Sequence, residues 1–292
     1  MLAFPNCKIN LGLYITKRRD DGYHDLETVF YPLKLKESLE IVPSKKTTLH
    51  VTGLHVHGEP EDNLVWKAYK LMKTKFPDKI PPFNIYLHKV IPMGAGLGGG
   101  SSNGAFMLQL LNDYCGLGLN KEQLSALALQ LGSDCPFFIH NTPQFAEGRG
   151  EKMSPVLLDL SDYSIQLICP EIHVSTAEAF KAITPDPAPF DLRNLHKLPV
   201  EEWKDFIGND FEEPVFKKYP ELAIIKSELY EQGALYASMS GSGSAIFGIF
   251  PDSKKADLKA DADHEDIYMH EGEAIKRKTK KKIADSEMAE AV

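Results

Sequence analysis

A glycine-rich segment is the feature that most constrains how this chain can fold. It reads Pro92-Met93-Gly94-Ala95-Gly96-Leu97-Gly98-Gly99-Gly100-Ser101-Ser102, with five glycines in the seven positions from 94 to 100. Such a stretch contributes little to a core, and it lets a ligand approach the backbone closely. A helical pattern begins at the two serines, and a helix N-terminus offers free N–H groups and a positive dipole end to an anion. The segment therefore predicts a polyphosphate-binding loop, with its two hydroxyls as further phosphate or magnesium contacts.

The same glycines match two other nucleotide motifs in part. Gly94-x-Gly96-x-x-Gly99, with Asp113 further along, satisfies the dinucleotide-binding fingerprint as a string of letters. That fold requires a strand, the loop, one helix and then a parallel strand, whereas here a second helix is expected before any strand. No Gly-Lys-Ser/Thr closes the segment, so the P-loop pattern fails as well. A Rossmann oxidoreductase is therefore a distant alternative, and a purely structural glycine loop is another.

Composition narrows the class of protein further. The chain has 292 residues, 33 Lys and Arg against 41 Asp and Glu, and a formal net charge of −8. At roughly 150 residues per domain, this length predicts about two domains. No apolar run reaches the ~18 residues of a membrane span, and the first residues lack the pattern of a signal peptide. Because the acidic balance also argues against nucleic-acid polymers as partners, we expect a cytoplasmic globular enzyme or small-molecule binder without membrane association.

Hydrophobic periodicity predicts an α+β chain. Alternating runs predict strands, at 9–16, 39–42, 49–52, 83–88, 164–169 and 245–250. A short apolar run predicts a further strand from Pro136 to Ile139, and residues 144–151 are expected to form a glycine-containing turn. Helices are expected from about residues 64, 101 and 120 and within 200–233, the third of them opened by a capping box of Asn120 and Gln123.

The chain is expected to divide into three parts. We place a first domain over 1–155, a second over 156–270 and a charged tail over 271–292. The tail carries six basic residues in the seven from 276 to 282, and such a run is typical of a solvated, disordered segment. A nucleic-acid or membrane anchor is the minority interpretation of the tail.

Several motifs, in one order along the chain, resemble those of the GHMP kinases, the family of galactokinase, homoserine kinase, mevalonate kinase and phosphomevalonate kinase. The central motif is the segment 92–102, which in that family wraps the phosphates of ATP. The others are Lys8-Ile9-Asn10-Leu11, Asp21-Gly22-Tyr23-His24-Asp25-Leu26, Leu131-Gly132-Ser133-Asp134-Cys135-Pro136, Phe145-Ala146-Glu147-Gly148-x-Gly150-Glu151 and Met239-Ser240-Gly241-Ser242-Gly243-Ser244. The resemblance covers about residues 5–250. It implies the GHMP kinase fold, with two α+β domains and the active site in the cleft between them.

The resemblance also supplies candidates for each part of a phosphoryl transfer. Transfer to an alcohol needs a cradle for the triphosphate, positive charge near the transferred group and an acceptor for the hydroxyl proton. Residues 92–102 would form the cradle for ATP, and Lys89 would also contact the nucleotide. Asp134 matches the family's general base, and Lys8 matches the catalytic lysine, which would keep Asp134 ionised and stabilise charge on the reacting oxygens. Magnesium is expected with ATP, with Ser101 or Ser102 as its candidate protein ligand.

Tyr23 and His24 are the residues most informative about the substrate. By resemblance, Tyr23 stacks on a cytosine ring and His24 hydrogen-bonds the polar edge of that ring, which is how proteins recognise an unpaired base. Phe180 is the candidate for the second face of the cytosine pocket, and Asn10 and Gly241 are candidate substrate contacts. We therefore expect a small-molecule substrate that carries a cytidine diphosphate group and is phosphorylated on a hydroxyl.

Two alternatives remain within the same fold. A GHMP kinase for another small alcohol, of the homoserine or mevalonate type, has no base to bind and is disfavoured by the Tyr-His pair. A non-catalytic nucleotide sensor has no need of both Lys8 and Asp134.

Two cysteines depart from the family pattern. Cys7 and Cys135 each adjoin an expected catalytic residue, at positions where small apolar residues are common. If Lys8 and Asp134 meet in the fold, the thiols also lie near the site. We therefore expect thiol alkylation to slow the enzyme and bound nucleotide to protect it.

Overall fold

The computed structural model of the chain describes residues 1–56, 58–251, 265–270 and 273–277. The strands of these residues pair into three sheets. The first sheet runs, in spatial order, β1 (Leu2–Ala3), β4 (Ser38–Pro43), β6 (Phe83–Lys89) and β5 (Thr48–Gly53). The second runs β2 (Asn6–Arg18), β3 (His24–Lys36), β7 (Gln144–Gly148) and β8 (Lys152–Pro155). The third runs β10 (Tyr236–Met239), β11 (Ile246–Pro251), β9 (Tyr163–Cys169), β12 (Glu265–His270) and β13 (Glu273–Arg277).

The helices gather at opposite ends of the molecule. At one end lie α1 (Leu64–Lys75), α2 (Gly99–Tyr114), α3 (Lys121–Ala128) and α4 (Cys135–His140). At the other lie α5 (Thr176–Lys181), α6 (Trp203–Phe206), α7 (Glu212–Lys218) and α8 (Pro220–Glu231). Short 3-10 turns occupy Pro60–Asp62, Leu192–Lys197 and Val200–Glu202. None of the helices in the described part of the chain is long and apolar enough to cross a membrane.

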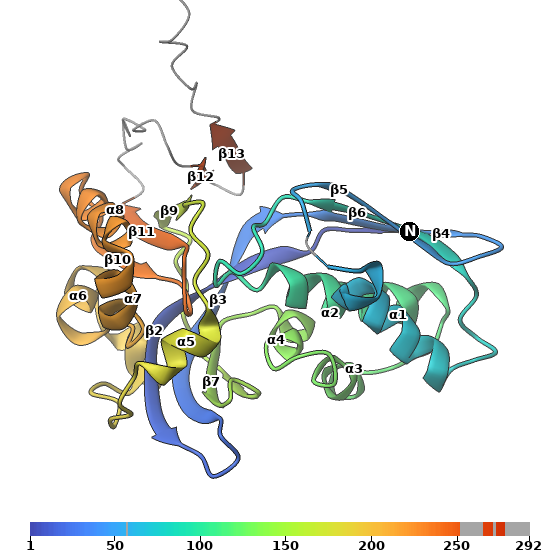
Figure 1. The fold of residues 1–292 in the computed structure, drawn as a ribbon, viewed down its shortest axis with the longest axis horizontal. Coiled ribbons are helices and arrows are strands. Elements are labelled where there is room, and N and C mark those ends of the chain that lie inside the picture. The colour runs from blue at the N-terminus through green and yellow to red at the C-terminus, as the bar shows by residue number, and fades with distance from the viewer. Residues whose placement is uncertain (57, 252–264, 271–272, 278–292) are drawn as a thin grey trace, which may run out of the picture.

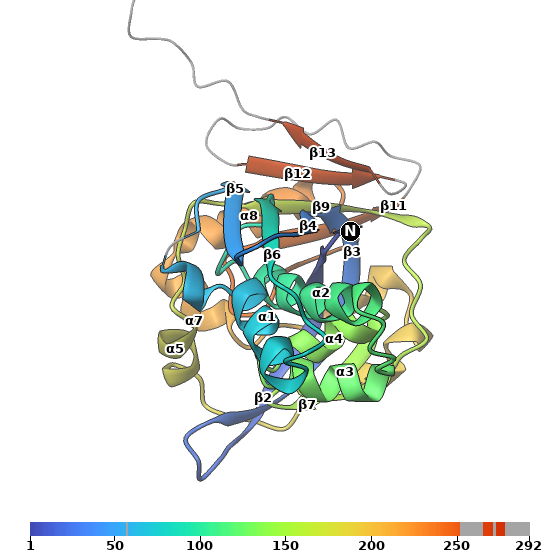
Figure 2. The same ribbon diagram turned by 90° about the vertical axis from the view of Figure 1, so that its right-hand side faces the viewer.

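The first sheet packs one face against α1 and α2 (Figures 1 and 2). In β6 the buried residues Phe83, Ile85 and Leu87 alternate with more exposed ones, because successive side chains of a strand point to opposite faces. Asn63 fixes the start of α1, since its side chain accepts a hydrogen bond from the Val65 N–H at 2.9 Å. This packing holds β6, and with it the start of the glycine-rich segment, on a rigid layer.

Two long strands connect the ends of the molecule. β2 and β3 are 13 residues each and run between the two groups of helices (Figure 1). Ten consecutive residues of β2, Asn6 to Ile15, are buried. They are covered on both faces. A register shift between Leu11 and Leu13 interrupts the alternation of side chains, so Ile9 and Leu11 belong to one hydrophobic cluster and Leu13 and Ile15 to another. β2 therefore carries its polar residues into the interior, where they can serve a site.

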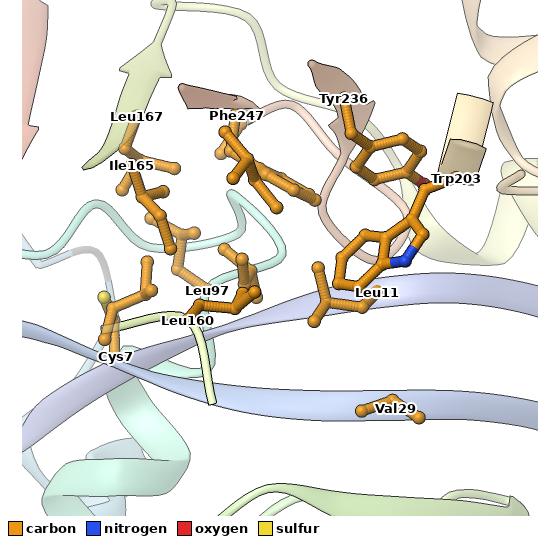
Figure 3. Close-up of a cluster of buried hydrophobic side chains, with 14 of the residues drawn as sticks. Cys7, Leu11, Val29, Leu97, Leu160, Ile165, Leu167, Trp203, Tyr236 and Phe247 are labelled. Carbon is orange, nitrogen blue, oxygen red and sulfur yellow. The ribbon is translucent and has the colours of Figure 1, made fainter. Parts of the chain in front are cut away.

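One hydrophobic cluster of the described residues joins both predicted domains. Figure 3 shows Cys7 and Leu11 of β2 together with Leu97 of the glycine-rich segment, and across from them Trp203, Tyr236 and Phe247 from the second half of the chain. Burial of these large apolar side chains from both halves of the chain is the main contribution to the stability of the contact between the halves. The glycine-rich segment is thus anchored by Leu97 in a core that both halves share. The predicted boundaries at residues 155 and 270 stay predictions.

The predicted strand from Pro136 to Ile139 is wrong, because these residues lie in α4. The apolar run is short and buried throughout, and periodicity cannot separate a buried helix turn from a buried strand over so few residues. Pro136 falls at the start of the helix, where a missing N–H and a fixed φ are tolerated. The helix then ends at Asn141, which has a positive φ of 52°.

Other expected elements are displaced in part. The turn expected over 144–151 contains strand β7, which pairs with β3 from Phe30↔Gln144 to Leu26↔Gly148. Strands β3 and β10 were not predicted from the sequence. Part of the expected tail, Glu273–Arg277, forms β13, while residues 271–272 and 278–292 lie outside the described residues.

Candidate active site

The glycine-rich segment forms the connection from β6 to α2. Gly94, Gly96 and Gly98 have φ values of 71°, 79° and 69°, a region that favours glycine over other residues. Gly98 is the N-cap of α2, and the helix begins at Gly99, two residues earlier than expected. The backbone N–H groups of the first turn are not used by the helix itself. The loop therefore leads into a helix end with free N–H groups, which is the arrangement that the predicted polyphosphate site requires.

Gly96 is needed for a close approach between the two halves of the chain. A Cβ atom at this position would lie 1.8 Å from the Ser240 carbonyl oxygen. Ser240 also donates from Oγ to the Gly96 carbonyl at 2.9 Å. The glycine-rich segment and the glycine loop at 240–244 are thus in direct contact. Gly241 lies beside Gly96, because a Cβ at 241 would lie 3.4 Å from the Gly96 Cα.

Lys8 lies at the centre of this contact. Its side chain is 4% exposed, and Nζ donates to the Gly96 carbonyl at 2.9 Å and to Asn10 Oδ1 at 2.6 Å. Asn10 is held in turn, because its Nδ2 donates to Thr28 Oγ1 at 3.0 Å. The three predicted residues Lys8, Asn10 and Gly96 therefore meet in one hydrogen-bonded group.

Asp134 faces Lys8 from the other side. It is the N-cap residue of α4, but its side chain makes no capping hydrogen bond to that helix. Its Oδ2 lies 3.7 Å from Lys8 Nζ, and the side chain is 33% exposed. A Cβ at Gly150 would lie 3.9 Å from Asp134 Oδ1, so the motif at 145–151 borders the same carboxylate. Asp134 is thus a carboxylate paired to a buried ammonium and open to a ligand.

The environment of Lys8 sets its charge in two opposing ways. Burial lowers the pKa of Lys8, while the carboxylate of Asp134 raises it. The Phe30 ring also lies under the ammonium, with 4.9 Å from Nζ to the ring centroid, which favours a cation. A second anion brought to the site would add to the groups that favour the charged lysine.

The first turn of α2 offers two hydroxyls. Ser102 is buried, and its Oγ has no hydrogen-bond partner among the described residues, while Ser101 is half-buried. The described residues contain no group of three or more His, Cys, Asp or Glu side chains that could hold a metal ion. The two serine hydroxyls fit magnesium, which is commonly held by substrate phosphates and only one or two protein oxygens.

A cavity of about 930 Å³ lies next to Asp134, and it contains the predicted base-binding residues. Tyr23, His24 and Phe180 line it, as do Gly132 and Ser133, the two residues before Asp134. The His24 and Phe180 rings stack on each other at 5.1 Å between centroids and 20° between planes. Tyr23 is 56% exposed, and the Arg149 guanidinium lies over its ring at 4.8 Å. The three aromatic residues named from the sequence therefore line one cavity, together with the two residues that precede Asp134.

Lys89 lies in a setting that its sequence does not indicate. It is 2% exposed, and its Nζ lies 2.7 Å from Oε1 of Glu37, which is 0% exposed. Asn103 joins the pair by donating from Nδ2 to Glu37 Oε2 at 2.6 Å. Glu37 Oε1 also accepts the N–H groups of Val90 at 3.0 Å and Ile91 at 2.7 Å. The amino group of Lys89 is therefore engaged inside the protein, just before the phosphate loop, in a position that does not favour contact with ATP.

The two thiols next to the catalytic pair are inaccessible. Cys7 and Cys135 both have an exposed fraction of 0%, and the Cys7 side chain is part of the core in Figure 3. Burial raises the pKa of Cys135 to about 12 and that of Cys7 further still. Because the thiolate is the reactive form, this setting argues against the expected slowing of the enzyme by alkylation.

Several residues of the site were missed in the sequence. Asn209 donates from Nδ2 to the carbonyls of Met239 and Gly241, both at 2.8 Å, and so shapes the second glycine loop. Thr28 supports Asn10, and Ser240 supports Gly96. Ser240 lies inside a recognised motif, but nothing in the sequence marks Asn209 or Thr28, because their partners are distant in the chain.

Comparison with known proteins identifies the class of enzyme. The model of the GHMP kinases N terminal domain matches residues 63–142, and that of the GHMP kinases C terminal matches 191–262. The chain belongs to the GHMP kinase family, and it is a small-molecule phosphotransferase. The alternative of a Rossmann oxidoreductase is thereby excluded, while the role of the glycine-rich segment stays a prediction.

Several similar proteins with high sequence identity carry one name. The chain is 49% identical to the 4-diphosphocytidyl-2-C-methyl-D-erythritol kinase of Parabacteroides distasonis, over 94% of this chain and 99% of the relative. It is 53% identical to the enzyme of that name from Bacteroides thetaiotaomicron, over 86% and 92% of the two chains. Among solved structures, it resembles a 4-(cytidine 5'-diphospho)-2C-methyl-D-erythritol kinase with a TM-score of 0.70 and 33% identity, over 85% and 90%. Mevalonate kinase of Methanococcus jannaschii, at 14% identity and a TM-score of 0.65 over 92% and 97%, shares the fold.

Proposed function

We propose that the chain transfers the γ-phosphoryl group of ATP to the 2-hydroxyl of 4-diphosphocytidyl-2-C-methyl-D-erythritol, a step of non-mevalonate isoprenoid precursor synthesis. The observation that carries this proposal is the placement of Asp134. Its carboxylate lies 3.7 Å from Lys8 Nζ, and the two residues before it line the aromatic cavity. Asp134 thus follows directly on the wall of the cavity for the acceptor, and it is linked to the phosphate loop through Lys8, which donates to the Gly96 carbonyl.

Each half of the reaction has its residues. The phosphates of ATP bind to the loop 92–102 and the first turn of α2, where N–H groups and the helix dipole favour anions. Ser101 and Ser102 are the candidate ligands of magnesium, which offsets the charge of the phosphates when it is bound. Lys8 stabilises the charge of the transferred group, and its contacts to Gly96 and Asn10 fix its position. Phosphoryl transfer needs mainly this positioning and charge.

Asp134 acts as the general base. Because it makes no capping bond to α4 and is 33% exposed, its second oxygen is free to accept the proton of the 2-hydroxyl. The ammonium of Lys8 stabilises the ionised carboxylate that accepts this proton. The acceptor hydroxyl then lies between the carboxylate and the γ-phosphate, which is the in-line arrangement that the transfer requires.

The nucleoside ends of the two substrates occupy different cavities. Tyr23, His24 and Phe180 hold the cytosine in the cavity of about 930 Å³. A separate cavity of about 380 Å³ is lined by residues between Leu49 and Asn63, and Leu54 at its wall donates to the Lys89 carbonyl at 3.0 Å. This second cavity lies next to the start of the phosphate loop and suits the adenosine of ATP. In our proposal Lys89 does not contact ATP but stabilises the start of the loop through its ion pair with Glu37.

The test is an assay of ADP release with ATP and Mg²⁺. The acceptors are 4-diphosphocytidyl-2-C-methyl-D-erythritol, homoserine and mevalonate, offered separately. Release with the cytidyl compound alone supports the proposal. Release with homoserine or mevalonate in preference to it would identify a GHMP kinase for another small alcohol, and no release with any of the three acceptors would overturn the proposal.

A further inference from the structure

The cavity beside Asp134 is positively lined although the chain as a whole is acidic. Arg18, Arg149 and Lys181 line it, and its lining contains no Asp or Glu among the described residues. The net charge of the whole sequence is −8. A cluster of cations in an acidic chain indicates that this cavity binds an anion. The proposed substrate supplies one, because it carries two phosphates between its cytidine and its reacting alcohol.

Arg149 is the cation placed between the two ends of that substrate. Its guanidinium carbon lies 4.8 Å from the centroid of the Tyr23 ring, at the base-binding end. The next residue, Gly150, is at the reacting end, since a Cβ there would lie 3.9 Å from Asp134 Oδ1. A molecule that places its base on Tyr23 and its hydroxyl at Asp134 must therefore pass its diphosphate by Arg149.

The turn that carries Arg149 is well defined, and its side chain is exposed. The Arg149 N–H donates to Glu151 Oε2 at 2.6 Å, and Gly148 and Gly150 on either side have φ values of 71° and 96°. The nearby Asp21 carboxylate is already held by Arg19, at 2.9 Å from Nη2. The guanidinium is thus oriented by the Tyr23 ring and is available to another anion.

We propose that Arg149 binds the diphosphate of the acceptor substrate and selects for acceptors that carry one. This inference rests on the proposed function. A guanidinium matches the geometry of phosphate with a planar, bidentate fork, and one held over an aromatic ring loses less freedom on binding. Arg149 occupies the position x in the motif Glu147-Gly148-x-Gly150-Glu151, and in this proposal it determines specificity for the acceptor.

The experiment compares the binding of CDP and of cytidine by calorimetry. The variants are Arg149→Met, which keeps length but removes charge, and Arg149→Lys, which keeps charge but loses the fork. Lys152→Met is the control, because Lys152 is an exposed cation three residues away that does not line the cavity. We expect Arg149→Met to weaken CDP binding by about tenfold or more, a loss of one charge-assisted contact. Cytidine binding should weaken by less than about fivefold, which is the upper value for an exposed cation–π contact.

The remaining outcomes are decisive as well. Partial recovery of CDP binding in Arg149→Lys supports the proposal, whereas equal losses for CDP and cytidine would show that Arg149 only holds Tyr23, and would overturn it. Unchanged CDP binding in Arg149→Met, or an equal loss in Lys152→Met, would overturn it too. If the unmodified protein binds neither CDP nor cytidine, the proposed function itself fails, and that result is distinguishable from the failure of Arg149 alone.

Discussion

Lys8 Nζ lies 3.7 Å from Asp134 Oδ2, and the two side chains differ in accessibility, at 4% for the lysine and 33% for the aspartate. Hydrogen bonds to Asn10 and to the Gly96 carbonyl hold the buried lysine in place, so the carboxylate of Asp134 is the group of the pair that a ligand can reach. This division suits a reaction in which one group holds charge and the other accepts a proton. It also means that the two residues should fail in different ways when they are changed.

Asp134→Asn should lower kcat by roughly 10²- to 10⁴-fold, the usual contribution of a general base. The amide keeps the shape of the side chain but cannot accept the hydroxyl proton. ATP affinity should stay close to that of the unmodified protein, because the phosphate loop does not use Asp134. Steady-state kinetics and nucleotide titration measure both values, and a near-normal kcat would refute the base assignment.

The alkaline limb of the pH–rate profile should report Lys8. Burial lowers the pKa of Lys8 below its ordinary value of 10.5, so the ammonium is lost, and activity falls, at a pH below that of a free lysine. Lys8→Arg should retain a reduced rate without this limb, because arginine stays protonated. An unchanged limb in the residual activity of Lys8→Arg would assign the titration to another group.

Two glycines of the loop should respond differently to alanine. Gly96→Ala places a Cβ 1.8 Å from the Ser240 carbonyl at a φ of 79°, so we expect a large loss of stability and of activity. Gly100→Ala has its nearest neighbour at 3.9 Å and sits in α2, where alanine is favoured by about 0.5–1 kcal/mol. We expect it to fold normally and to raise KM for ATP, because the new methyl group stands where phosphates approach. Thermal melts and ATP kinetics check the pair, and equal melting temperatures for the two variants would contradict this account.

Glu37 and Lys89 should act on stability and on the loop. Removing one member of a buried ion pair leaves an unpaired charge, at about 3–5 kcal/mol. We therefore expect Lys89→Met and Glu37→Gln each to lower the free energy of unfolding, measured with urea. A direct ATP contact predicts something else for Lys89→Met, namely weaker ATP binding with normal stability, and that result would restore the role suggested by its sequence.

The motifs could be recognised from the sequence because each is a short run whose chemistry is local. The loop 92–102 could be interpreted from its own glycines and serines, whereas the roles of Asp134 and of the Tyr23-His24 pair follow from the resemblance of their short motifs to those of the GHMP kinases. The role of a residue could not be predicted from the sequence where that role depends on burial by distant parts of the chain. Lys89 looks like a surface cation until Glu37, 52 residues away, is placed beside it.

The errors in the fold have a related cause. The run Pro136 to Ile139 is apolar throughout, so only its packing inside the helical layer makes it a helix. Strand β3 carries charged residues and a proline, and it is held by pairing with β2 and β7 on either side. The proposed role of Arg149 could not be predicted from the sequence, because it depends on the positions of Tyr23 and Asp134, which belong to other motifs.

The most direct test of the central claim is the position of the new phosphate. The protein is incubated with ATP, Mg²⁺ and 4-diphosphocytidyl-2-C-methyl-D-erythritol, and the product is examined by ³¹P NMR. Carbon 2 bears a methyl group and no hydrogen, so a 2-phosphate should appear as a phosphomonoester signal without three-bond coupling to a proton, and Asp134→Asn should yield almost none. A phosphomonoester signal split by such a proton would place the phosphate on another hydroxyl and contradict the account.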